Sequence, residues 1–370
     1  MRAGMIVVYP ILTVMGKDLH LSTTSLSWLA SIPLICFALA APLAAYLRKL
    51  GDTNHVIGLA LWILGVSLLL RASGSTIALY IFTIFMGIAI TLLNTSLPVW
   101  IKEHAGEHVG SITGIYVGIV GISATLAMAL SAPLSALTSL SWKLSILPWG
   151  VIAVSFAIWW QWKMKNRNRS SSTSNDFVTF DFSLLRNSRA WQIAIFFSLQ
   201  SALYYASATW FPTVLLSRGY DLNRAGYFTS LSALLGSIVG MAVPVLFRKY
   251  LDFRLVLMSL TSLILVGLTG VLLDTGPRLL LWLILISIGL SSTFPLVLFL
   301  CVIRAKNPSG TQSLSIMSQF VGYIVASLSP LIMGGLFDAT GDWKWSIYYL
   351  IGLGAVQMYF SYGAGKPGTV

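Results

Sequence analysis

The chain has 370 residues, of which 56% are hydrophobic and 9% are charged. A soluble domain carries about 25% charged residues, so this sequence lacks the polar side chains for a water-facing surface, and a soluble globular fold is excluded. The net charge of +12 lies in short segments between apolar runs, where membrane topology explains it better than nucleic-acid binding does.

Twelve apolar runs predict an all-α, multi-pass membrane protein, because about 20 apolar residues cross a bilayer as a helix. We place them at residues 1–16, 26–47, 55–70, 76–101, 109–136, 144–162, 190–216, 222–247, 253–272, 278–303, 310–337 and 345–364. An even number of spans puts both termini on the side of the central loop. Lys and Arg are about twice as frequent on that side, so we expect both termini in the cytoplasm and the chain in the cell membrane, without a cleaved signal peptide.

The basic, Ser-rich segment 163–189 divides the chain into 1–162 and 190–370. Its middle, Ser170–Asn175, contains no apolar side chain and is typical of a flexible linker. We therefore predict an N-terminal six-helix bundle, a cytoplasmic linker loop and a C-terminal six-helix bundle.

The two halves repeat at an offset of about 200 residues, as several matches in corresponding spans indicate. Arg48-Lys49 and Asp52 recur as Arg248-Lys249 and Asp252, and Gly87, Thr91 and Lys102 recur as Gly289, Thr293 and Arg304. Parallel six-helix repeats are typical of the major facilitator superfamily, in which substrate binds near the membrane midplane between the halves. Pro10 corresponds to Pro212, and this match leaves the first helix about ten residues shorter than the seventh. We expect a truncated first helix.

Four stretches resemble the cyanate/2-nitroimidazole transporter family of this superfamily. They are Gln319, Gly322-Tyr323, Pro330 and Asp338 to Trp343 in the eleventh span; Gln200-Ser201, Tyr204 and Trp210-Phe211-Pro212 in the seventh; Asn94, Leu97-Pro98 and Ile101-Lys102 in the fourth; and Phe294-Pro295-Leu296 in the tenth. The first span has Arg2 and Pro10 at the family's spacing, with Ala3 where the family usually has Pro. The resemblance implies a transporter of small anions or small polar solutes.

Arg2 is the main candidate for substrate binding. Its guanidinium stays charged and offers five donors, and no Asp or Glu lies in the middle of any predicted span. A substrate anion would satisfy it, whereas the alternative is a side chain that reaches cytoplasmic water from a chain terminus.

Further candidates are polar and aromatic side chains within the spans. The amides of Asn94, Gln200 and Gln319 either bind substrate or join helices, and the rings of Tyr204, Phe294 and Tyr323 either line the site or fill the core. For Trp210, near the end of a span, a position in the interfacial aromatic belt is an equal alternative to a site wall.

Arg48 and Asp52, with Arg248 and Asp252, stand where the superfamily carries a gating loop, and they either pair between the halves or serve membrane topology alone. Gly114-x-x-x-Gly118 and Gly236-x-x-x-Gly240 favour close helix packing within the chain rather than dimerisation. His104 and His108, beside Glu103 and Glu107, are expected to be solvated loop residues rather than a metal site.

These observations predict a secondary active or facilitative transporter of a small anion or compact polar solute, cyanate-like, that works by alternating access. The alternatives are a multi-substrate efflux pump and a degenerate membrane scaffold without transport. The sequence has neither a phosphate-binding loop nor a nucleophile–base pair, so no ATP drive and no enzyme are predicted. We expect a monomer whose partners are a small-molecule substrate and membrane lipid, with no nucleic acid, cofactor or metal. Uniport, exchange and entry of a protonated substrate remain alternatives for coupling.

Overall fold

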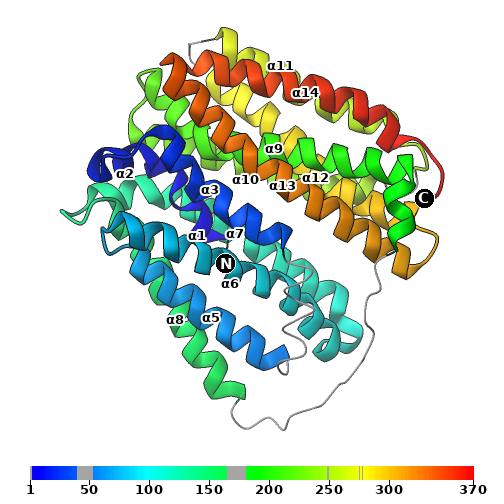
Figure 1. The fold of residues 1–370 in the computed structure, drawn as a ribbon, viewed down its shortest axis with the longest axis horizontal. Coiled ribbons are helices and arrows are strands. Elements are labelled where there is room, and N and C mark those ends of the chain that lie inside the picture. Colours follow the sequence, from blue (N-terminus) through cyan, green and yellow to red (C-terminus); the bar gives the residue numbers. More distant parts are fainter. Residues whose placement is uncertain (1, 40–52, 165–180, 248–249, 275, 277) are drawn as a thin grey trace. The chain divides into compact units, whose positions relative to one another are not determined.

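A computed structural model of the chain describes residues 2–39, 53–164, 181–247, 250–274, 276 and 278–370 (Figure 1). Among these residues the regular secondary structure is helical throughout. Most of the predicted linker, together with Arg48, Asp52 and Arg248, lies outside the described residues.

The described helices divide into two compact units. The first comprises residues 1–21 and 28–177, and the second comprises 22–27 and 178–370. Elements of the first part of the chain are α1 (Ala3–Ile6), η1 (Tyr9–Ile11), α2 (Leu12–Leu19), α3 (Thr23–Ala38), α5 (Thr53–Arg71), α6 (Thr76–His104), η2 (Gly106–His108), α7 (Val109–Ala136) and α8 (Trp142–Met164). The rest are η3 (Phe182–Arg186), α9 (Ser188–Ser217), α10 (Leu222–Leu246), α11 (Arg254–Leu273), α12 (Leu279–Arg304), α13 (Pro308–Thr340) and α14 (Trp343–Gly365).

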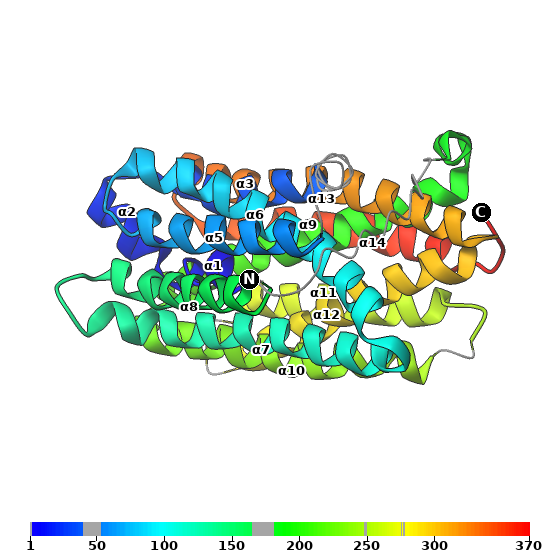
Figure 2. The same cartoon turned by 90° about the horizontal axis from the view of Figure 1, so that it is seen from below.

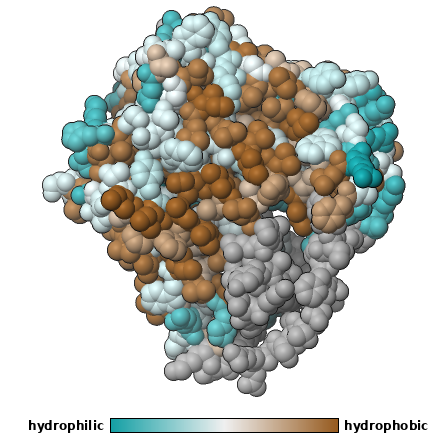
Figure 3. Space-filling model, viewed as in Figure 1, coloured by the Kyte–Doolittle hydropathy of each residue, from teal (hydrophilic) through white to brown (hydrophobic). Residues whose placement is uncertain are grey.

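The all-α membrane architecture expected from hydropathy is confirmed. With α1, η1 and α2 counted as one interrupted helix and the short η2 and η3 left out, the described residues form 12 helical segments, and 8 helices are long and apolar enough to cross a membrane. Apolar side chains cover much of the face drawn in Figure 3. Exposed apolar surface on this scale is incompatible with water and fits contact with lipid tails.

Each unit packs its helices in the same pattern. In the first unit α5 packs against α6 and α8, and in the second α11 packs against α12 and α14. Figure 2 shows α11 and α12 running side by side. The third helix of each unit therefore has the same two neighbours, as expected from the repeat in the sequence.

Two glycines allow a close contact between α10 and α12 in the second unit. A Cβ atom on Gly236 would lie 2.5 Å from the carbonyl oxygen of Ser287, and one on Gly240 would lie 2.4 Å from that of Ser291. The helices α10 and α12 thus approach backbone to backbone, which confirms the prediction of packing within the chain for this glycine pair. At Gly118 in α7, by contrast, an added Cβ atom would meet no described atom within 4 Å.

Candidate functional site

The first helical segment, residues 3–19, is interrupted after its first turn. Pro10 has no N–H and cannot continue the helical ladder, so α1 ends at Ile6 and the chain passes through η1 into α2. Side chains of other helices satisfy carbonyl groups near the break: Ser131 of α7 donates to the oxygen of Val7, and Arg71 of α5 donates to that of Gly4 at 2.9 Å.

Two predicted site residues lie in the part of the first unit that contains α1 and the helices in contact with it. Arg2 immediately precedes α1, is half-buried, and acts electrostatically on Tyr116 of α7. Asn94 is half-buried on α6, and α1 contacts both α6 and α7. The first unit therefore holds both residues on helices that contact one another.

The second unit gathers the predicted aromatic residues into one cluster. Its ring contacts are Tyr204–Tyr205 (5.1 Å between centroids), Tyr205–Tyr323 (6.4 Å), Phe197–Tyr323 (5.7 Å) and Phe197–Phe294 (5.8 Å). Phe197 and Tyr205 are buried and connect the three predicted rings. Neither residue was expected from the sequence to belong to the site. Edge-to-face contacts at these distances are favourable, and Tyr204 and Phe294, at the two ends of the chain of contacts, are half-buried.

Gly322, the glycine of the Gly-Tyr pair, leaves no room for a side chain. A Cβ atom there would lie 2.2 Å from the ring of Phe197, so this ring packs directly on the backbone of α13. The neighbouring Tyr323 then meets Phe197 edge to face at an interplanar angle of 83°.

The two glutamines occupy different environments. Gln200 is 1% exposed; its amide nitrogen donates to the carbonyl of Leu290 on α12 at 3.0 Å, and its oxygen accepts from Ser201. These contacts match the helix-joining alternative raised for this residue. Gln319 is half-buried on α13, one turn before Tyr323.

Trp210 belongs to the core of the second unit. It is 1% exposed, its indole N–H donates to the carbonyl of Pro330 at 3.0 Å, and its ring lies 5.2 Å from that of Trp343. The belt interpretation is therefore wrong, because an interfacial tryptophan keeps its N–H at the membrane surface.

The Asp-x-Thr-Gly-x-Trp stretch of the eleventh span builds a helix connection. Gly341 ends α13 in the left-handed conformation, at a φ of 71°, and Asp342 caps α14 by accepting from the N–H of Lys344. Asp338 accepts hydrogen bonds from the backbone N–H groups of Thr23 and Thr24. These two residues form the first turn of α3, and this turn belongs to the second unit. The described contacts of these residues are structural.

Comparison with known proteins identifies the family. The protein-family model described as Major Facilitator Superfamily matches residues 1–330 of the chain. The chain belongs to the major facilitator superfamily. It is 33% identical over 368 residues to the uncharacterized transporter YycB of Bacillus subtilis, covering 99% of this chain and 90% of that one.

Two further relatives of this superfamily member match the family that the motifs indicated. The 2-nitroimidazole transporter of Escherichia coli is 28% identical, over 96% of this chain and 90% of the relative, and the cyanate transport protein CynX of Escherichia coli is 23% identical, over 98% and 94%. Among solved structures, a bacterial homologue of the lysosomal transporter Spinster superposes with a TM-score of 0.77 at 12% identity, over 98% of this chain and 93% of that one. The predicted fold and family are confirmed, and membership makes the chain a multi-pass transporter protein rather than an enzyme.

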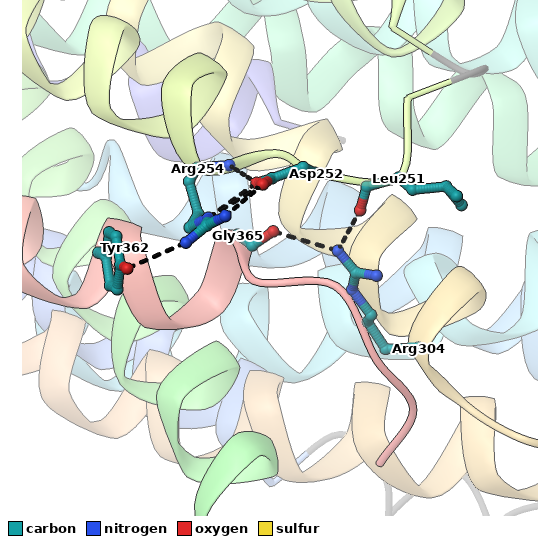
Figure 4. Close-up of polar contacts among 6 residues, drawn as sticks. All are labelled: Leu251, Asp252, Arg254, Arg304, Tyr362 and Gly365. Carbon is teal, nitrogen blue, oxygen red and sulfur yellow. Dashed lines mark hydrogen bonds and ion pairs between the residues drawn. The ribbon is translucent and has the colours of Figure 1, made fainter.

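In this superfamily member, Asp252 lies in a polar network at one end of the second unit (Figure 4). The Arg254 guanidinium contacts the Asp252 carboxylate at 2.6 Å and donates to the hydroxyl of Tyr362 at 2.9 Å. Arg304 donates to the carbonyls of Leu251 and Gly365 at 2.9 and 3.2 Å. The network ties the start of α11 to the ends of α12 and α14.

We expect acid to weaken this network. Hydrogen bonds from the Arg254 guanidinium, and then from its backbone N–H, lower the pKa of Asp252 to about 2. Because the folded-state pKa is below the unfolded value of about 3.9, the stabilisation is complete above that value and is lost as the pH falls toward 2. The thermal unfolding temperature in detergent should fall in the wild type as the pH is lowered over this range. It should fall less in Asp252→Asn, and in Tyr362→Phe it should fall as much as in the wild type. Equal declines in Asp252→Asn and wild type would contradict the assignment.

Proposed function

We propose that the chain carries a small anion or compact polar solute, cyanate-like, across the cell membrane by alternating access. Residues 1–162 and 190–370 act as two six-helix bundles that rock against each other, joined by the linker 163–189. The transport function of the superfamily and the substrates named for two relatives, 2-nitroimidazole and cyanate, support this substrate class.

The observation that carries the proposal is the interrupted first helix with Arg2 at its start. Arg2 supplies positive charge to the anion, and Asn94 supplies an amide on a neighbouring helix of the same unit. Tyr204, Phe294 and Tyr323, with the half-buried Gln319 on α13, provide an aromatic surface for the solute within the second unit, while Gln200 joins α9 to α12. A flat or compact solute suits such an aromatic surface.

The remaining parts of the proposal concern orientation and gating. The excess of Lys and Arg on the side of the linker places both termini in the cytoplasm. Arg48 and Asp52, with Arg248 and Asp252, regulate the change between conformations, and Asp252 is paired with Arg254 at the start of α11. The chain acts as a monomer in contact with lipid, without a cofactor or metal.

Counterflow in proteoliposomes tests the substrate class. We expect the wild type to exchange labelled cyanate. In Arg2→Gln the rate of cyanate exchange should fall at least about tenfold, because a hydrogen-bonded charge contact is removed. Arg224→Gln is the matched control, since Arg224 pairs with Asp221 on an exposed surface.

Each other outcome is informative. Unchanged exchange in Arg2→Gln would remove this residue from the mechanism. The aromatic cluster also favours apolar ligands, so transport of a hydrophobic dye without any anion exchange would favour an efflux pump. Transport of neither would favour a scaffold.

A further inference from the structure

Arg71 is a charged side chain buried completely inside the first unit. It ends α5 and is 0% exposed, and it ranks among the largest fully buried side chains of the described residues. A guanidinium at the end of a span ordinarily reaches water, because its charge is expensive to bury. Its burial here requires a specific reason.

One nitrogen of Arg71 has an evident structural role. Nη1 donates to the carbonyl of Gly4 at 2.9 Å and lies 3.0 Å from the sulfur of Met86 on α6. Gly4 lies just ahead of the break in the first helix, and a Cβ atom at this glycine would lie 2.8 Å from Leu68 of α5. The missing side chain at residue 4 thus lets α1 and α5 approach, and Nη1 bridges them.

The other edge of the guanidinium has no such role. Nε and Nη2 are buried and have no hydrogen-bond partner among the described residues. Their N–H groups point the same way, which is the fork that matches the two oxygens of a carboxylate or a similar planar anion. A residue that only bridged two helices would not need an arginine with its bidentate edge left over.

No carboxylate of the described residues forms an ion pair with Arg71, and the three described ion pairs all lie in the second unit. The charge of Arg71 is therefore available to an anion from outside the protein.

We propose that the Nε–Nη2 edge of Arg71 binds a planar oxyanion with two neighbouring oxygens, such as a carboxylate, at the interruption of the first helix. This inference rests on the proposed transport of small anions and narrows their class. Because Arg71 is fully enclosed in the described conformation, the anion reaches this edge when the short α1 moves away from α5 and α6 within the first unit, while α5 and α6 stay packed together.

The test compares two anions in proteoliposomes containing the full chain. Labelled formate has two oxygens in one plane with their carbon, whereas cyanate is linear. We expect Arg71→Lys, which keeps the charge and a donor for the Gly4 carbonyl, to raise the KM for formate at least about tenfold and to change that for cyanate much less. Met86→Leu is the matched control, because it removes the contact of Nη1 with sulfur and leaves the Nε–Nη2 edge intact.

A second measurement needs no variant and decides the matter if Arg71→Lys does not fold. Formate should raise the thermal unfolding temperature of the wild type, and formamide, a neutral molecule of the same shape, should not. Equal effects of the two, or an unchanged KM for formate in folded Arg71→Lys, would overturn the inference. Exchange of cyanate without any binding of formate would overturn it while leaving the proposed function standing, and exchange of no anion would overturn both.

Discussion

Gly240→Leu is expected to destabilise the second unit by about 3 kcal/mol or more. A Cβ atom at this position would lie 2.4 Å from the carbonyl oxygen of Ser291 and 2.7 Å from its carbonyl carbon, and both are main-chain atoms of α12. A flexible side chain can rotate away from such a contact, but the backbone of a neighbouring helix must shift as a whole. The α10–α12 contact is among the most extensive in the unit, so the shift spreads along both helices.

Thermal unfolding in detergent and the yield of monodisperse protein will show the loss. Gly352→Leu is the matched control, because Gly352 lies on the exposed face of α14 and an added Cβ atom there meets nothing within 4 Å. We expect this variant to equal the wild type or exceed it slightly, since leucine favours a helix more than glycine does. Equal losses in the two variants would mean that glycine flexibility, rather than the close approach of α10 and α12, determines the effect.

Most of the fold could be predicted from hydropathy, because the bilayer fixes the length and apolar character of each span. The second half shows this well: the predicted run 278–303 corresponds to α12 (Leu279–Arg304), and 253–272 corresponds to α11 (Arg254–Leu273). The repeat and its glycine pair at Gly236 and Gly240 likewise follow from local patterns. These features depend on residues that are close in the sequence or on the constant thickness of the bilayer, so they can be predicted without the tertiary structure.

The candidate site could be predicted only in part. The rings of Tyr204, Phe294 and Tyr323 do come together, but Phe197, which joins two of them, looks in the sequence like any apolar residue of α9. Arg71 looks like a topological charge in a loop, since it directly follows an apolar run. Its burial depends on Gly4, 67 residues earlier, and on a break in the first helix, so no local pattern encodes it.

The aromatic cluster and Arg71 suggest different tasks for the two units. Within the first unit, positive charge lies next to the broken helix, and within the second, aromatic faces lie on α9, α12 and α13. Charge selects the sign of a solute, whereas ring faces select its flatness and size. Variants in the first unit should therefore change the preference between anions and neutral molecules, and variants in the second should change the preference for solute shape.

Trp210→Ala is expected to cost about 3–5 kcal/mol, the range for removal of a large buried aromatic side chain. The indole fills space beside Trp343, and its N–H satisfies the carbonyl of Pro330 on α13. Trp210→Phe keeps most of the volume and loses the donor, so a cost of about 1 kcal/mol is expected.

Thermal or chemical unfolding of the two variants separates volume from hydrogen bonding at this position. Trp345→Ala is the matched control on α14, because Trp345 is 57% exposed. A tryptophan of the interfacial belt would lose little on truncation in detergent, so similar small losses for Trp210→Ala and Trp345→Ala would contradict the core position of Trp210. A large loss for Trp210→Ala alone would show that Trp210 joins α9 to α13 as part of the core of the second unit.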